Sequence, residues 1–362
     1  MKIKVEGVGL ILVINPGGGS TKIAVFDGET CVFNKSIPHA EPGGAFEEML
    51  VQRDRLERAI ADALAAEGIK VEALGAIVGR GGALKPMVSG TYRVNGLLAE
   101  DIRTGNVQAK HPSNLGALMA FELGERLGKP AFMVDPVSVD EFIPEARLTG
   151  LPELERKSLD HPLNSKMVAR RAAREMGKTY EAINLIVVHM GTGISVSAHL
   201  RGRMIDVNNA QDGGPFSTQR TGGLPTTQLV ALCYSGAHTR DELHARVTRK
   251  GGLSAHLGTD DMVEAEKRAR AGDVKADAVL RAMAYQIAKE IGASAAALRG
   301  RVDAVVYTGG VAHCKYAVDL VREWVDFVTP NVFVYPGEHE MESLAQGALR
   351  VLRGEETAKE YR

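Results

Sequence analysis

A turn of small residues between two apolar runs is the first stretch whose residue types could do chemistry. The segment from Val13 to Phe26 reads VINPGGGSTKIAVF, with Gly17 to Gly19 at its centre. β-Favouring residues on both sides predict a strand, a tight turn and a second strand. Glycines at a hairpin tip permit positive φ and let a ligand approach backbone N–H groups, while Ser20 and Thr21 add hydroxyl donors. The turn therefore suits a phosphate.

The turn also has a simpler interpretation. Asn15-Pro16-Gly17 is by itself a good turn between two core strands, with no ligand. A P-loop is excluded because the Walker pattern places Gly-Lys-Ser/Thr at the start of a helix, whereas Lys22 enters a predicted strand. The spacing of a Rossmann dinucleotide site is also absent.

The same pattern recurs in the second half of the chain. Leu185 to Val188 is an apolar strand, His189 to Gly193 reads HMGTG, and strands at Ile194 to Ala198 and Arg203 to Val207 follow. Two such hairpins predict a duplicated fold whose turns face one another across a cleft. The phosphates of a nucleotide could then be held from both sides.

Helices and further strands must position these turns. The elements expected are strands at Cys31–Ile37, Leu74–Val78, Ala131–Val134, Val302–Tyr307 and Val332–Tyr335, a loop at Pro38–Gly44, and helices at Phe46–Glu67, Asn114–Leu127, Ser165–Met176, Asp273–Leu298 and Met341–Leu352. Strands that alternate with helices predict an α/β sheet, whose ligands lie at the carboxyl ends of strands. Gly309 and Gly310 follow one such end, where a base or ribose could lie against bare backbone.

Length, charge and cysteine content limit the class of protein. A chain of 362 residues predicts two domains, which we place at 1–152 plus 346–362 and at 153–345. A net charge of -1 argues against nucleic acid or an anionic membrane as partner, and the apolar runs are too short for a membrane span. Three cysteines without metal spacing favour a reduced, cytoplasmic compartment.

Several longer segments resemble a known enzyme family. They are NPGGGSTKIAVF, HPSNLGALMA, FMVDPVSVDEF, GLPELERKSLDHPLNSKMVARR, LIVVHMGTGISV, GRMIDVNNAQDGGPFSTQRTGGLP, VYTGGVA and PGEHEMESLAQG. Together they resemble the butyrate kinases of the acetokinase family, within the superfamily of acetate and sugar kinases, heat-shock cognate proteins and actin. The resemblance implies a duplicated actin-like (ribonuclease H-like) two-domain fold with an active site in the interdomain cleft. It also implies a homo-oligomer.

The resemblance further implies reversible, ATP-dependent phosphorylation of a short-chain carboxylate, with Mg²⁺. Such a transfer needs charge to hold two anions together, donors on the phosphoryl group and a metal on the phosphate oxygens. By resemblance, Arg80 fixes the substrate carboxylate, for which a guanidinium fork is suited, and Arg220 binds the transferring phosphoryl group. The alternatives are a surface arginine and a salt-bridge arginine.

The other implied roles belong to histidines, donors and carboxylates. His161 and His189 would donate to phosphoryl oxygens and His111 would lie nearer the substrate, although each could be a structural histidine instead. The remaining assignments are Asn15 on the γ-phosphate or a metal-bound water, Gly17, Ser20, Lys22, Gly191, Gly193, Gly309 and Gly310 on the nucleotide, and Asp135 and Glu340 on the metal.

Both metal assignments have alternatives. Asp135 precedes a proline and could be a turn or N-cap residue. Glu338, Glu340 and Glu342 could all be acids favoured by the dipole of the last helix, and register favours Glu340 among them.

Several positions depart from the family pattern. Gly18 and Gly19 stand where the first turn usually has Ser and Thr, and Thr192 stands where Gly is usual. Asp160 replaces an apolar or aromatic residue beside His161, and an added anion there favours a charged histidine.

Three other functions remain open. One is a branched-chain fatty-acid kinase, because an apolar pocket discriminates one methylene by only about 1–3 kcal/mol. The second is an actin-like or chaperone-like ATPase without carboxylate kinase activity. The third is a non-catalytic oligomeric scaffold, which would bind nucleotide without forming product.

Overall fold

The structure is a computed structural model that describes residues 7–39 and 46–362. The chain divides into two compact units, each described here by itself. Unit 1 comprises Met1–Val139, Pro162–Asn164 and His339–Arg362, and unit 2 comprises Asp140–His161 and Ser165–Glu338. Unit 2 thus begins and ends earlier in the chain than the domain that we placed at 153–345.

Unit 1 is built on a seven-stranded sheet with the order β12-β5-β6-β4-β1-β2-β3. β1, β2 and β3 pair antiparallel, whereas β1, β4 and β6 run parallel. The strands are β1 (Leu10–Pro16), β2 (Ser20–Asp27), β3 (Thr30–Pro38), β4 (Leu74–Arg80), β5 (Thr91–Arg93), β6 (Ala131–Val134) and β12 (Lys359–Glu360).

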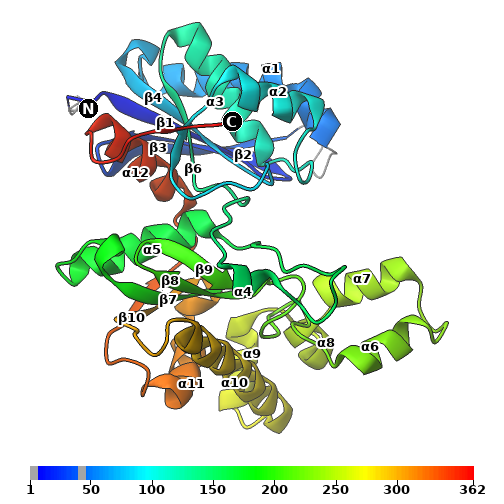
Figure 1. The fold of residues 1–362 in the computed structure, drawn as a ribbon. Helices are drawn as coiled ribbons and strands as arrows, with labels where there is room; N and C mark the ends of the chain where they lie inside the picture. Colours follow the sequence, from blue (N-terminus) through cyan, green and yellow to red (C-terminus); the bar gives the residue numbers. More distant parts are fainter. Residues whose placement is uncertain (1–6, 40–45) are drawn as a thin grey trace. The chain divides into compact units, whose positions relative to one another are not determined.

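Helices cover both faces of this sheet, so the central strand β1 is buried on both sides (Figure 1). Leu10, Leu12 and Ile14 belong to a core cluster shared with α1 (Phe46–Ala66), α2 (Gly96–Thr104) and α3 (Asn114–Leu127). Ile11 and Val13 belong to the opposite cluster, with α12 (Glu340–Leu352). The period-two alternation of a strand explains this division.

Unit 2 repeats the arrangement in a five-stranded sheet with the order β11-β10-β7-β8-β9. β7, β8 and β9 are antiparallel, while β7, β10 and β11 are parallel. The strands are β7 (Asn184–Met190), β8 (Ile194–Leu200), β9 (Arg203–Val207), β10 (Ala304–Gly309) and β11 (Val332–Pro336). This order matches β6-β4-β1-β2-β3 strand for strand, which confirms the predicted duplication.

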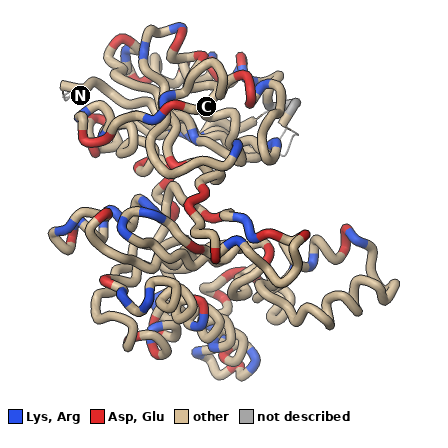
Figure 2. The backbone as a smooth tube through the Cα atoms, in the orientation of Figure 1, with Lys and Arg blue, Asp and Glu red and all other residues tan. Residues whose placement is uncertain are grey.

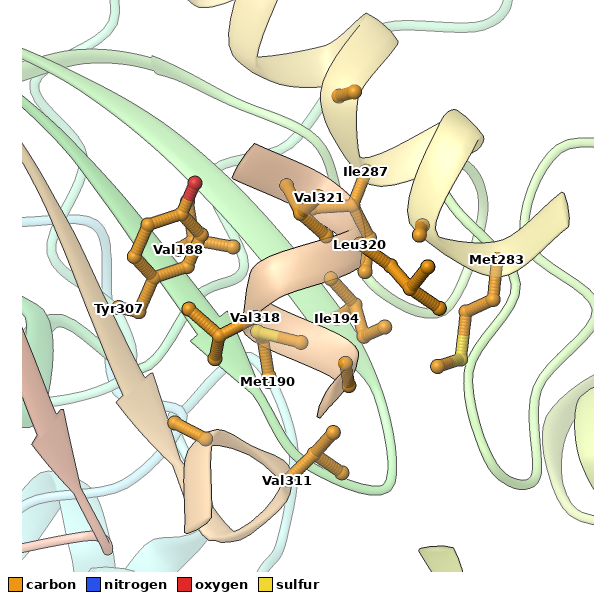
Figure 3. Packing of buried hydrophobic residues seen from close by; sticks show 14 of the residues in the cluster. Val188, Met190, Ile194, Met283, Ile287, Tyr307, Val311, Val318, Leu320 and Val321 are labelled. Carbon is orange, nitrogen blue, oxygen red and sulfur yellow. The ribbon is translucent and has the colours of Figure 1, made fainter. Parts of the chain in front are cut away.

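The core of unit 2 also has two layers. One face of its sheet packs against α5 (Pro162–Glu175), with Leu185 and Val187 pointing to it. The other face packs against α10 (Val274–Ala297) and α11 (Lys315–Val325), in a core cluster that includes Val188, Met190, Ile287, Tyr307 and Val321 (Figure 3). Asp273 caps the start of α10, since its carboxylate accepts from the backbone N–H groups of Lys275 and Ala276.

Several helices have no counterpart in the sequence prediction. They are α2, α11, α4 (Pro144–Arg147), α6 (Thr226–Cys233), α7 (Arg240–Thr248), α8 (Gly252–Leu257) and α9 (Met262–Arg270), and three short 3₁₀ helices lie at Val71–Ala73, Tyr180–Ala182 and Gly310–His313. α6 buries none of its residues, so it lacks the one-sided apolar stripe that reveals a helix in a sequence. Part of the loop expected at Pro38–Gly44 lies outside the described residues.

Acidic and basic residues are interspersed along each unit (Figure 2). None of the described helices combines the length and the apolar character that crossing a membrane requires.

Candidate active site

The first glycine hairpin joins β1 to β2 through Gly17 to Gly19. Its turn is closed by a hydrogen bond from the Gly17 N–H to the Ser20 carbonyl, at 2.8 Å. None of these glycines has a positive φ, so the turn does not use the left-handed conformation that glycine permits. A Cβ at Gly18 would meet no atom within 4 Å, which leaves the tip open on its outer side. The three-residue loop closes with ordinary φ values, and glycine here provides access rather than a special conformation.

The second hairpin joins β7 to β8 through Gly191 to Gly193, with a hydrogen bond of 3.0 Å from the Gly191 N–H to the Gly193 carbonyl. Here a Cβ at Gly193 would lie 2.3 Å from Nη1 of Arg220, so a larger residue would displace the guanidinium. The guanidinium of Arg220 therefore rests directly on the hairpin backbone.

Arg80 ends β4 and belongs to a group of three interacting side chains, which we call the arginine–glutamate group (Asn15, Arg80 and Glu340). Arg80 makes a bidentate pair with Glu340, at 2.7 Å to Oε1 and 3.0 Å to Oε2. Asn15 accepts from Arg80 at 3.2 Å and donates to Glu340 at 2.8 Å. The three predicted site residues thus form a closed ring of hydrogen bonds.

Close backbone packing places Arg80 there. A Cβ at Gly79 would lie 1.9 Å from the Gly116 carbonyl oxygen, and a Cβ at Gly116 would lie 2.6 Å from the carbonyl oxygen of Arg80. These two glycines let the first turn of α3 touch the end of β4. The arginine is consequently fixed against both elements.

His111 lies just before α3, where its Nδ1 is 2.7 Å from Ser113 Oγ and accepts from the Ser113 N–H at 3.2 Å. An accepting Nδ1 leaves Nε2 as the protonated nitrogen of the neutral ring. Desolvation lowers the pKa of His111, and the positive charge of Arg80 lowers it further. His111 is therefore a neutral donor near the arginine–glutamate group.

The two predicted metal carboxylates have different surroundings. Asp135 is buried with a φ of 36°, and its Oδ1 accepts from Ser89 Oγ at 2.6 Å and from the Gly90 N–H at 2.8 Å. Glu340 pairs with Arg80, while Glu342 contacts His339 at 2.9 Å. Of the three glutamates left open by the sequence, Glu340 is the one that joins other predicted site residues.

In unit 2 the structure brings together a histidine group (Asp160, His161, His189 and Ser195). The rings of His161 and His189 stack with centroids 4.0 Å apart and planes 11° from parallel. Asp160 Oδ1 accepts from Ser195 Oγ and lies 3.7 Å from Nδ1 of His161. Burial lowers the pKa of His189 to about 3, and the nearby charge of His161 contributes, so His189 is neutral near pH 7.

Arg220 is half-buried, and no described carboxylate lies within ion-pair distance of it. Its Nη1 donates to the carbonyl of Ala210 at 3.3 Å, and its backbone N–H donates to Ser217 Oγ at 3.0 Å. Ser217 Oγ in turn donates to the carbonyl of Thr192 in the hairpin. Desolvation lowers the pKa of Arg220 but leaves the guanidinium charged. The hairpin thus presents a cation that no described carboxylate neutralises.

The remaining predicted nucleotide contacts lie at strand ends. Lys22 is exposed on β2, opposite Asn15 in the strand register. Gly309 has a φ of 88°, and a Cβ there would lie 2.4 Å from the Met190 carbonyl oxygen. The ends of β10 and β7 therefore touch, which brings Gly309 and Gly310 beside the second hairpin.

The sequence analysis did not single out Asn208 and Ser217, whose side chains form hydrogen bonds that fix loops of unit 2. Asn208 bridges the start of β8 by accepting from the Val196 N–H at 2.7 Å and donating to the Ile194 carbonyl at 2.9 Å. Ser217 anchors the segment that carries Arg220. The only signal for them is their place among small polar residues between Val207 and Leu224.

Comparison with known proteins identifies the fold and part of the chain. Residues 156–328 match the model of the acetokinase family. Acetate kinase from Porphyromonas gingivalis is similar at a TM-score of 0.76 and 18% identity, over 95% of this chain and 100% of that one. A propionate kinase from Francisella tularensis gives 0.72 and 18%, over 94% and 98%. Acetate kinase from Entamoeba histolytica gives 0.73 and 14%, over 93% and 98%.

The matched family segment contains the histidine group and Arg220, whereas the structural similarity extends over both units. The chain therefore has the two-domain α/β fold of acetate and propionate kinases, and residues 156–328 of it match the acetokinase family model.

Proposed function

We propose that this protein is an ATP-dependent kinase of short-chain carboxylates, with butyrate as its preferred substrate. A carboxylate oxygen attacks the γ-phosphorus of ATP while the bond to the β–γ bridging oxygen breaks, giving acyl phosphate and ADP. The observation that carries the proposal is the half-buried guanidinium of Arg220, which rests on a glycine hairpin inside the acetokinase family domain without a partner among the described carboxylates.

Arg220 is the proposed phosphoryl-binding residue. A charged group withdrawn from water without an anionic partner is costly, and an anionic ligand would remove that cost. An arginine that neutralises the transferring phosphoryl group accelerates such reactions by about 10³-fold or more. The reaction needs no general base, because the attacking carboxylate is already ionised at neutral pH.

Arg80 is the proposed carboxylate-binding residue. Its bidentate contact with Glu340 shows that a carboxylate fits the guanidinium fork in this position. In the proposed complex the substrate carboxylate binds Arg80, and His111 donates to it from Nε2. Asn15, which contacts both Arg80 and Glu340, would hold the group in register.

Oxygen donors in the arginine–glutamate group fit Mg²⁺. This ion typically binds one or two carboxylates and completes its coordination with water and substrate phosphates. The Glu340 carboxylate and the Asn15 amide oxygen, which accepts from Arg80, supply that chemistry. Asp135 has one oxygen already committed to Ser89 and Gly90. Among the described residues, no three His, Cys, Asp or Glu side chains gather as a metal cluster. When bound, Mg²⁺ would neutralise charge on the β- and γ-phosphate oxygens.

The remaining predicted residues would hold the nucleotide and the phosphoryl group. Backbone N–H groups of Gly17, Gly191 and Gly193 and the Ser20 hydroxyl would contact phosphates, with Lys22 adding charge. Gly309 and Gly310 would lie against the nucleoside. His161 and His189 would donate to phosphoryl oxygens.

The preference for butyrate is supported by the resemblance of residues 150–171 and 202–225 to butyrate kinases. The experiment that tests it traps acyl phosphate as the hydroxamate with ATP, Mg²⁺ and a panel of acids. The highest kcat/KM is expected for butyrate, above acetate, propionate, isobutyrate and isovalerate. A higher value for isobutyrate or isovalerate would instead identify a branched-chain fatty-acid kinase.

The same assay separates a different class of protein. An actin-like or chaperone-like ATPase would hydrolyse ATP without forming hydroxamate from any acid. That outcome would overturn the proposal.

We also propose that the enzyme is a cytoplasmic homo-oligomer. Exposed apolar side chains on and beside α6, among them Val230 and Tyr234, support self-association. Light scattering after size exclusion measures the oligomeric state, and a monomeric mass across micromolar concentrations would contradict this part of the proposal.

A further inference from the structure

Asp160 is a buried carboxylate that lies directly before α5 and beside His161. Its side chain has no exposed surface. Oδ1 accepts from Ser195 Oγ on β8, and Oδ2 accepts from Ser165 Oγ on α5 at 3.0 Å. Two hydroxyl donors from two different elements therefore fix the orientation of the carboxylate.

His161 is the neighbour that bears on the charge of Asp160. Among the residues that the structure describes, its imidazole is the group within ion-pair distance, with Nδ1 3.7 Å from Oδ1; this is too long for a hydrogen bond, and the ring is a cation only when protonated. Burial alone would raise the pKa of Asp160, but the contacts with His161 and Ser195 hold it well below its usual range. A buried carboxylate persists in a folded protein when a cation and hydrogen bonds compensate for lost water.

The stacked histidines cannot both carry charge at low cost. Their ring centroids are 4.0 Å apart, a distance at which two imidazolium ions repel one another. His189 is fully buried and neutral near pH 7, whereas the His161 side chain is 40% exposed and faces the carboxylate. Of the two stacked rings, the fully buried His189 is therefore the neutral one.

We propose that Asp160 is a positioning residue that aligns His161 through Nδ1 and matches a positive charge on that ring, so that Nε2–H donates to the phosphoryl group while His189 stays neutral. This inference rests on the proposed function for its phosphoryl ligand. The protonation pattern itself does not depend on that ligand.

The ionisable groups that face one another here are Asp160, His161 and His189. Ser165 and Ser195 add hydrogen bonds but no charge. An alternative is that Asp160 is only a structural link between α5 and β8. That alternative predicts a loss of stability when the carboxylate is changed, with no change in the protonation of His161.

The first test uses wild-type protein without substrate. Long-range ¹H–¹⁵N NMR of ¹⁵N-histidine-labelled protein at pH 7, with His161→Gln for assignment, distinguishes doubly from singly protonated rings. Protons on both nitrogens of His161 and on one nitrogen of His189 are expected. A singly protonated His161 would overturn the proposal without any variant of Asp160.

The second test compares Asp160→Asn with Ser165→Ala. The asparagine side chain would retain the size of the aspartate but lose its charge, whereas Ser165→Ala removes one hydrogen bond and leaves the charge. We expect Asp160→Asn to convert His161 to a singly protonated ring at pH 7 and Ser165→Ala to leave it unchanged. Equal spectra for Asp160→Asn and wild type would contradict the proposal.

Activity gives the third readout. Asp160→Asn should lower kcat by about tenfold at pH 7, with little change in the KM for ATP. The loss should vanish when the same change is made in His161→Gln, because Asp160 acts through His161. An undiminished loss in that background would show a structural role.

The two proposals can fail separately. Wild-type protein that forms no acyl phosphate would contradict the proposed function, yet the NMR result would still decide the role of Asp160. Conversely, an active kinase with a singly protonated His161 would keep the function and remove this inference.

Discussion

The two glycine hairpins occupy the same place in two copies of one sheet but differ in how their nearby arginines are satisfied. In unit 1, Arg80 has a bidentate carboxylate partner in Glu340, and the tip at Gly18 has open space around it. In unit 2, Arg220 rests on Gly193 and has no partner among the described carboxylates. The two units therefore share a sheet with the same strand order but differ in the charged groups beside the hairpin.

This difference indicates separate tasks. In the proposed mechanism Arg80 exchanges the Glu340 carboxylate for that of the substrate, which favours selective and reversible binding. Arg220 is fixed by the hairpin and lacks only an anion, which favours preorganised stabilisation of a transferring phosphoryl group. A substitution in each unit should therefore affect a different kinetic constant.

The largest expected effect is that of Arg220→Ala. Removing the preorganised cation should lower kcat by about 10³-fold, with a smaller change in the KM for butyrate. Arg220→Lys is the matched control, and it should recover only part of the rate because an ammonium lacks the guanidinium fork. Steady-state kinetics in both directions measure these changes. A wild-type kcat for Arg220→Ala would contradict the proposed role of Arg220 in phosphoryl transfer.

The next largest effect is that of Arg80→Ala. Loss of charged hydrogen bonds worth roughly 1.5–3 kcal/mol should raise the KM for butyrate by about 10- to 100-fold, with a smaller effect on kcat. Arg80→Lys retains the positive charge and tests whether the bidentate geometry of the guanidinium is needed. A fall in kcat without a change in KM would mean that Arg80 and Arg220 share one task.

A pair of glycine substitutions tests the hairpins themselves. Gly193→Ala places a Cβ 2.3 Å from Arg220 Nη1 and should lower kcat by about tenfold through displacement of the guanidinium. Gly18→Ser meets no atom within 4 Å and should stay within about threefold of wild type. Circular dichroism controls for folding, and equal kinetics for the two variants would contradict the difference between the turns.

These contrasts also show what the sequence can predict. The strands and the duplication follow from apolar runs and repeated glycine turns, which are local signals. The bidentate contact of Arg80 with Glu340 is not local, because it joins the end of β4 to the start of the last helix. Whether a described carboxylate lies beside Arg220 likewise depends on the tertiary fold of unit 2 and not on the local sequence.

Other features of the site could not be predicted from the sequence, because they depend on backbone conformation and on packing between elements. Glycines at Gly17 to Gly19 leave both signs of φ open, and only the folded turn shows that it closes without positive φ. The departure at Asp160 was visible in the sequence, whereas its links to Ser195 and Ser165 depend on how β8 packs beside α5. Helices α6 to α9 were not predicted from the sequence, because they do not all carry a regular apolar stripe.

The smallest effect at neutral pH concerns His189. The folded state keeps this ring neutral, with a pKa of about 3 against an ordinary value of 6.5, so the unfolded state binds an extra proton as pH falls. Its contribution to stability is therefore complete above pH 6.5 and is lost toward pH 3, at up to about 1.4 kcal/mol per pH unit.

His189→Gln should consequently flatten the pH dependence of the free energy of unfolding between pH 6.5 and about pH 4, measured by urea denaturation. Exposed His244 provides the control, since His244→Gln should keep the wild-type slope. An unchanged slope for His189→Gln would show that His189 is not held neutral.

The central claim is that phosphoryl transfer goes from ATP to a carboxylate, and ³¹P NMR of the wild-type reaction tests it most directly. With ATP, Mg²⁺ and butyrate, the γ-phosphate signal should decline as an acyl phosphate signal rises in equal amount, and neither should change without the acid. Equal release of inorganic phosphate with and without butyrate would contradict the claim and identify an ATPase.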